Sequence, residues 1–226
     1  MNISARLLVR RALLFGGFIV WALDAEAQGT FQNLGFERAV LTGFPINTGY
    51  YGTNATLPNW QWSPQTTFGY GDPSTNVVFN SVAISSAALS LHAAGSRLAP
   101  VIHGNYSLFI QGGEGVYGFT GASIYQTALI PIFSRTLFFL GGSSLQVSFN
   151  GQSLTPFALS NVATHTYWAA DISAYANQSG ELRFSVPVNS SSLLDDIRIS
   201  QAVVPEPGVL MLAGLFMVCA LGFWRR

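Results

Sequence analysis

Alternation of apolar and polar residues with a period of two marks much of the middle of the chain. Residues 145–149 (LQVSF), 182–186 (LRFSV) and 197–200 (IRIS) all follow it, and in a strand such alternation puts the apolar side chains on one face. Asn150-Gly151 comes directly after the first of these segments. This dipeptide adopts the positive φ angles of a tight turn, so the pattern predicts a hairpin there.

Further strand candidates are short, rich in β-branched and aromatic residues, and separated by glycine, proline, asparagine and serine. They are residues 77–81, 88–92, 106–111, 123–129 and 136–140. No long helical periodicity occurs outside the two ends of the chain. Many short strands without a strong helix predict an all-β fold of two packed antiparallel sheets, a jelly-roll-like β-sandwich over residues 28–203.

The C-terminal end departs from this pattern. Residues 208–224 contain no charged side chain, follow Pro205 and Pro207, and end at Arg225 and Arg226. A run that is apolar on all sides predicts a transmembrane helix, although it is short against the roughly 20 residues that span a bilayer. Arginines at its end favour the cytoplasmic side, so the preceding chain lies beyond the membrane. The alternative is a buried terminal helix of a soluble domain.

The N-terminal end supports the same topology. Residues 1–11 carry three arginines, residues 12–23 are apolar, and Ala25-Glu26-Ala27 fits a small-x-small cleavage site. This order predicts a signal peptide over residues 1–27, recognised by the export machinery and removed by signal peptidase. The alternative is an uncleaved anchor. The chain thus divides into a signal peptide (1–27), a β-sandwich domain (28–203) and a C-terminal segment (204–226).

Charge and cysteine content exclude several classes of function. The 226 residues have a formal net charge of zero, and all basic residues are arginines. Residues 28–203 hold five arginines and seven acidic residues, a formal charge of −2, so no nucleic-acid-binding surface is expected. The single cysteine, Cys219, lies in the C-terminal apolar run. The exported part therefore has neither a disulfide nor a cysteine metal cluster.

The C-terminal segment resembles the PEP-CTERM sorting signal of exported bacterial proteins. Its three parts occur in order: Pro205-Glu206-Pro207, the apolar run, and Arg225-Arg226. The resemblance implies an inner-membrane-anchored intermediate and recognition by an exosortase-type processing enzyme that cuts near the triplet. It also implies delivery to the cell surface or to an extracellular matrix of exopolysaccharide. The alternative is a proline-rich linker before an ordinary anchor.

Three short stretches of the middle resemble the jelly rolls of galactose-binding-like domains and carbohydrate-binding modules. They are FQNLGFE (31–37), LPNW (57–60) and LLDDIRIS (193–200). These match the start, the early tryptophan and the last strand of such modules. In those families an acidic residue near the first strand and an aspartate near the last share a structural calcium.

That resemblance implies Glu37, Asp195 and Asp196 as calcium ligands. Ca²⁺ takes about 6 to 8 oxygen ligands, and a backbone carbonyl such as that of Asn33 would add to the carboxylates. Alternation also places Asp195 on the inward face with residues 197 and 199, where it needs a metal or a hydrogen-bond network. The alternatives are that Asp195 lies in water at a strand end, or that Asp196 pairs with Arg198.

No catalytic motif emerges from the sequence. His92, His103 and His165 show no ligand spacing, and no G-x-S-x-G elbow occurs. Asp72 and Glu114 are the acids in glycine-rich loops, but nothing in the sequence brings them together as a glycosidase pair. We therefore expect a protein that is not an enzyme.

Aromatic residues crowd into one glycine- and asparagine-rich stretch. Trp60, Trp62 and Tyr70 are the candidates for stacking against sugar rings, with burial in the core as the alternative, above all for Trp60. The sequence thus predicts a non-catalytic, polysaccharide-associated protein of the cell envelope or extracellular matrix. A lectin-like module and a secreted hydrolase are the alternatives.

Overall fold

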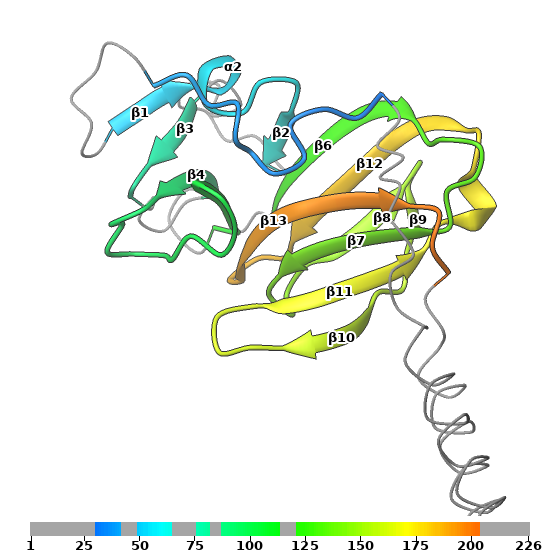
Figure 1. The fold of residues 1–226 in the computed structure, drawn as a ribbon. Coiled ribbons are helices and arrows are strands. Elements are labelled where there is room, and N and C mark those ends of the chain that lie inside the picture. The colour runs from blue at the N-terminus through cyan, green and yellow to red at the C-terminus, as the bar shows by residue number, and fades with distance from the viewer. Residues whose placement is uncertain (1–29, 42–48, 65–75, 82–86, 114–120, 204–226) are drawn as a thin grey trace, which may run out of the picture.

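The computed structural model describes residues 30–41, 49–64, 76–81, 87–113 and 121–203 (Figure 1). Among these residues, no helix has both the length and the apolar character needed to cross a bilayer. The predicted signal peptide and the predicted C-terminal membrane helix lie outside the described residues.

Two sheets contain the strands of the domain (Figure 1). The large sheet runs in the order β1 (Gly49–Gly52), β3 (Asn76–Phe79), β4 (Ala88–Ala93), β5 (Tyr106–Gln111), β13 (Ser191–Ser200), β7 (Thr136–Gly141), β11 (Thr166–Asp171) and β10 (Phe157–Asn161). The small sheet runs in the order β2 (Gln61–Pro64), β6 (Ala122–Leu129), β12 (Ser179–Val186), β8 (Gln146–Phe149) and β9 (Gln152–Ser153). The helical elements in the described residues are α2 (Thr53–Thr56) and the 3₁₀ turn η2 (Ser173–Tyr175).

Neighbouring strands pair antiparallel, with one exception. β3 and β4 are parallel, with Val78 opposite Ser90 and Phe79 opposite Leu91. The prediction of an all-β protein with two packed sheets is confirmed, and the prediction of purely antiparallel pairing is wrong at this pair. The hairpin prediction is also confirmed, because Asn150 and Gly151 have φ angles of 48° and 75° between the paired strands β8 and β9.

The inner faces of the two sheets form one hydrophobic core. β7 of the large sheet contributes Phe139, and β12 of the small sheet contributes Phe184, whose rings meet edge-on with centroids 5.3 Å apart. Strand β12 shows why alternation identifies the inward residues, because Leu182, Phe184 and Val186 are buried and the residues between them are partly exposed. The alternating apolar residues of β12 thus face the large sheet.

Strand β13 lies inside the large sheet, between β5 and β7, and carries a bulge. The pairing register with β7 shifts between Asp195 and Arg198, and Asp196 has a φ angle of 46°. Leu194 and Ile197 both enter the core although they are three residues apart. An inserted residue reverses the alternation, so the prediction that Asp195 shares the inward face with residues 197 and 199 is wrong.

Near the start of the domain, residues 33–38 form a tight turn that is fastened to Trp60. Asn33 and Phe36 have φ angles of 53° and 59°, which is uncommon for a bulky residue such as phenylalanine. The Trp60 indole Nε1–H donates to the Asn33 carbonyl at 2.9 Å, and the Phe36 ring packs 5.8 Å from that indole. We call residues 33–38 the N-terminal turn.

Candidate functional site

A cavity of about 370 Å³ lies where three separate parts of the chain meet. The N-terminal turn forms one wall, the β13 bulge (residues 195–198) forms another, and the loop between β4 and β5 adds His103. The polar side chains that line it are those of Asn33, Glu37, Arg38, His103, Asp196 and Arg198. The volume is at the lower end of the roughly 300–1,000 Å³ found for ligand pockets.

Backbone contacts hold the first two walls together. The Ile197 N–H donates to the Leu34 carbonyl at 3.1 Å, which joins the N-terminal turn to the last strand. Asn33, Phe36 and Asp196, all with positive φ, belong to these two segments. Asparagine and aspartate tolerate this conformation, but it is unfavourable for a bulky residue such as Phe36. The surrounding structure therefore holds the N-terminal turn in shape.

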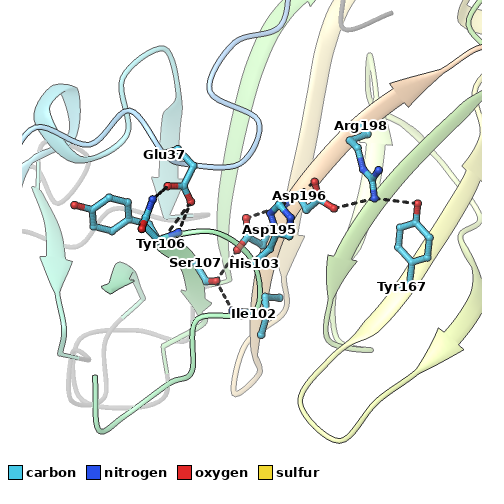
Figure 2. Close-up of polar contacts among 10 residues, drawn as sticks. Glu37, Ile102, His103, Tyr106, Ser107, Tyr167, Asp195, Asp196 and Arg198 are labelled. Atoms are coloured by element: carbon cyan, nitrogen blue, oxygen red, sulfur yellow. Dashed lines mark hydrogen bonds and ion pairs between the residues drawn. The ribbon is translucent and has the colours of Figure 1, made fainter. Parts of the chain in front are cut away.

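Glu37 fixes the third wall. Its Oε1 accepts hydrogen bonds from the backbone N–H groups of Asn105 at 2.8 Å and Tyr106 at 3.2 Å. Its Oε2 accepts one from the Asn105 side chain, also at 2.8 Å (Figure 2). Gly104 allows this close approach, since a Cβ atom there would overlap the Glu37 carboxylate. Glu37 thus anchors the end of the β4–β5 loop.

Asp196 links His103 to Arg198 across the cavity (Figure 2). Its Oδ2 lies 2.9 Å from Arg198 Nη2, and its Oδ1 lies 3.9 Å from His103 Nδ1. Arg198 Nη2 also donates to the Tyr167 hydroxyl at 3.3 Å. Its guanidinium carbon lies 5.7 Å from the centroid of that ring. The pairing of Asp196 with Arg198 is the alternative that the sequence left open.

Asp195 lies next to the cavity but is fully buried. Its Oδ2 accepts from the Ser107 hydroxyl at 2.6 Å, and its Oδ1 accepts from the Asp196 N–H at 2.7 Å. Ser107 Oγ in turn accepts from the Ile102 N–H at 2.8 Å, so the β4–β5 loop reaches this carboxyl. Burial raises the pKa of Asp195 to about 7, against the opposing effect of its hydrogen bonds.

His92 is a second buried titratable group on the large sheet. It lies on β4 and pairs across the strands with Ser107. Its Nδ1 lies 2.7 Å from the Ser96 hydroxyl, and burial lowers its pKa to about 4. His92 is therefore neutral in the folded protein at neutral pH.

The residues implied as calcium ligands come together only in part. Asn33, Glu37 and Asp196 line the cavity and Asp195 lies next to it. The carboxylates of Glu37 and Asp196, however, are bonded to N–H groups and to Arg198. The described part of the chain contains no group of three histidine, cysteine or acidic residues placed to hold a metal. As they stand, these side chains do not form a calcium shell, and calcium stays a prediction.

Two of the three aromatic residues predicted to stack on sugars, Trp60 and Trp62, do not line this cavity. Trp60 and Trp62 are only 2% and 4% exposed and belong to the core. The prediction of a stacking surface is therefore wrong for both, because their apolar rings are buried between the sheets. Tyr70 lies outside the described residues, as do all five residues of the predicted sorting signal: Pro205, Glu206, Pro207, Arg225 and Arg226.

Three residues of the site were not singled out from the sequence. They are Arg38, His103 and Tyr167, which come from the N-terminal turn, the β4–β5 loop and β11. Arg38 directly follows Glu37 in the FQNLGFE stretch, which is the one local signal available. His103 and Tyr167 reach the site only through the tertiary fold.

The candidates for catalysis do not assemble among the described residues. His165 lies in the turn between β10 and β11, where its Nδ1 is 2.9 Å from the Thr164 hydroxyl. Asp72 and Glu114 lie outside the described residues. Asp195, whose pKa is the most perturbed among the carboxyls described, has no exposed surface that a substrate could reach.

Comparison with known proteins gives distant likenesses only. No protein-family model and no curated protein sequence matches the chain. Three solved structures resemble it at TM-scores of 0.38, 0.39 and 0.36. In that order they are the enzymatically active domain of tailspike protein 4 of bacteriophage CBA120, the K1 cleaved adhesin domain of Lys-gingipain from Porphyromonas gingivalis W83, and TmCBM61 in complex with β-1,4-galactotriose.

The sequence identities of these three are 13%, 12% and 11%. The tailspike match covers 63% of this chain and 19% of the tailspike chain. The adhesin match covers 70% of this chain and 99% of the adhesin domain. The TmCBM61 match covers 76% of this chain and 97% of TmCBM61. The chain thus spans about a fifth of the tailspike chain.

Proposed function

We propose that the chain is an exported, non-catalytic protein of the cell envelope or extracellular matrix, whose jelly-roll-like sandwich associates with polysaccharide. The observation that carries the export part is the order of features in residues 204–226. Pro205-Glu206-Pro207, an uncharged apolar run and Arg225-Arg226 follow one another without interruption. Each part suits the role: prolines end the preceding structure, the apolar run fits a bilayer, and the arginines stay inside.

The geometry of the cavity supports a binding role over a catalytic one. Its two carboxylates, Glu37 and Asp196, are bonded to backbone amides and to Arg198 respectively. A general acid or base needs a proton that can move to or from a substrate. Side chains tied to the protein in this way instead hold a surface in a fixed shape, which favours recognition.

Mass spectrometry of the protein in envelope and extracellular fractions tests the export part. We expect a mature N-terminus at Gln28 and a C-terminus near Pro205-Glu206-Pro207. Recovery of the surface protein with Arg226 still attached would count against exosortase-type processing. Recovery of the uncut chain from the cytoplasm alone would count against export altogether.

Co-sedimentation with the exopolysaccharide of the producing cells tests the polysaccharide part. We expect the processed protein to pellet with the polymer and to remain in solution after the polymer has been digested. A protein that stays in solution in both cases would contradict the proposed association.

A further inference from the structure

We infer that the cavity between the N-terminal turn and the β13 bulge binds one neutral, hydroxyl-rich sugar residue of a polysaccharide chain, with the Tyr167 ring beside it. The inference rests on the proposed polysaccharide association. It adds the place of binding and the charge class of the ligand.

The cavity offers hydrogen-bond donors and acceptors together. Arg38, His103 and Arg198 supply N–H donors, and Glu37 and Asp196 supply carboxylate oxygens. Sugar hydroxyls both donate and accept hydrogen bonds, so a ligand rich in hydroxyls can use both kinds of group. An apolar ligand could form no hydrogen bond with any of these groups.

The charges of the cavity favour a neutral ligand. The two arginines of the lining, Arg38 and Arg198, balance its two acids, Glu37 and Asp196, in formal charge. Asp196 already neutralises Arg198 at 2.9 Å. An anionic sugar would approach two carboxylates at close range, and like charges brought together oppose binding.

The walls of the cavity are fixed before any ligand arrives. The N-terminal turn is tied to Trp60, the β4–β5 loop is tied to Glu37, and the bulge is tied to the N-terminal turn. A site that needs no ordering on binding loses less conformational entropy. A sugar residue can therefore bind here with comparatively few contacts.

Tyr167 supplies an apolar surface at the edge of the polar lining. Its ring is partly exposed and stacks on Phe138, with centroids 5.5 Å apart and an angle of 21° between the ring planes. The hydrogen bond from Arg198 sets the position of its hydroxyl (Figure 2). An aromatic ring next to hydrogen-bonding groups suits a sugar, which has C–H faces and a rim of hydroxyls.

The small sheet provides a matched control. There Arg183 pairs with Glu181, two residues before it, and lies 4.0 Å above the Tyr125 ring. Both Glu181 oxygens are bound by Arg183, at 2.7 Å and 2.9 Å, and its Nη1 donates to the Ser123 hydroxyl. The side chains of Arg183 and Arg198 are similarly exposed, at 29% and 32%. Arg183 does not line the cavity.

Affinity electrophoresis of the processed protein tests the inference. The gels contain a galactan, a β-glucan, a mannan or, as the acidic polymer, alginate. The variants are Arg198→Gln, Asp196→Asn and Arg183→Gln. Asparagine tolerates the positive φ of residue 196, so Asp196→Asn changes the charge and keeps the bulge. We expect retardation by at least one neutral polymer, about tenfold weaker binding in the two cavity variants, and no change in Arg183→Gln.

Four results would overturn the inference, and they separate it from the proposed function. Retardation by alginate alone, lost when salt is added, would show an anionic ligand, because exposed charge interactions are screened by salt. Wild-type retardation in both cavity variants would place the polysaccharide site elsewhere. Equal weakening in Arg183→Gln would mean that the effect is not specific to the cavity. No retardation by any polymer, the cells' own exopolysaccharide included, would remove the polysaccharide association itself.

Discussion

Asp195 and His92 are buried titratable residues on the same sheet, and burial shifts their pKa values in opposite directions. Both are fully buried, and both disfavour their charged form for that reason. The pKa of Asp195 rises from 3.8 to about 7, whereas that of His92 falls from 6.5 to about 4. Between pH 4 and 6.5 the folded protein thus holds the Asp195 proton and excludes the His92 proton.

The two pKa shifts make the free energy of unfolding depend on pH, and a substitution at either residue isolates the effect of the other. Folded Asp195 binds a proton that the unfolded chain releases, so its contribution to the free energy of unfolding falls as pH rises from about 4 to about 7. Folded His92 excludes a proton that the unfolded chain binds, so its contribution is complete above pH 6.5 and is lost as pH falls to about 4. Over the shared range the two slopes oppose each other.

We therefore expect Asp195→Asn to give stability that rises from about pH 4 to 6.5, and His92→Gln to give stability that falls from about pH 4 to 7. The wild type should show a shallower slope than either variant. Urea unfolding midpoints measured across this pH range check the expectation. If the two variants gave parallel pH profiles, the opposed burial effects would be excluded.

At the scale of the elements, strands with regular flanks could be predicted and irregular ones could not. Residues 106–111 were predicted with the observed bounds of β5, because turn-forming residues flank the segment. Strand β10 was missed, since four of its five residues are exposed and its pairing with β11 is irregular. The β13 bulge could not be predicted from the sequence pattern. Residues 197–200 alternate between apolar and polar whether or not an extra residue precedes them, so the alternation does not reveal the inserted residue.

Only Asn33 and the two acidic residues of the candidate site could be predicted from the sequence. Asn33, Glu37 and Asp196 were named from short resemblances, and they do line one cavity. His103 could not be named, because nothing in the local sequence shows that the β4–β5 loop folds back toward the last strand. Arg198 was recognised only as a partner for Asp196, and its neighbour Tyr167 lies 31 residues away in the chain.

The β4–β5 loop also supports a prediction about its two glycines. Gly95 and Gly104 have φ angles of 87° and 62°, which cost an alanine about 1–2 kcal/mol. A Cβ atom at Gly95 meets nothing within 4 Å, whereas one at Gly104 would overlap the Glu37 carboxylate. We expect Gly104→Ala to lower the free energy of unfolding more than Gly95→Ala, as measured by urea denaturation. Equal losses would show that Glu37 does not anchor the loop.

For the molecule as a whole, the predicted calcium can be tested without knowing its ligands. An ion that binds only the folded state stabilises the protein by mass action, so its removal lowers the melting temperature. The charged groups at the cavity are already paired, Glu37 with amide N–H groups and Asp196 with Arg198. We therefore expect EGTA to leave the melting temperature unchanged. A drop that is reversed by added calcium, and not by magnesium, would show a structural calcium.

Strand β13 is the last strand in the described part of the chain, but it lies inside the large sheet and not at its edge. Its residues 191–200 fill the gap between β5 and β7, so the large sheet stays in two halves until the ribosome has delivered nearly the whole domain. Until then, the strand that joins the β5 side of the sheet to the β7 side is missing. Only a few residues separate this closing strand from Pro205. The ribosome therefore synthesises the strand that completes the large sheet and the Pro205-Glu206-Pro207 segment almost together.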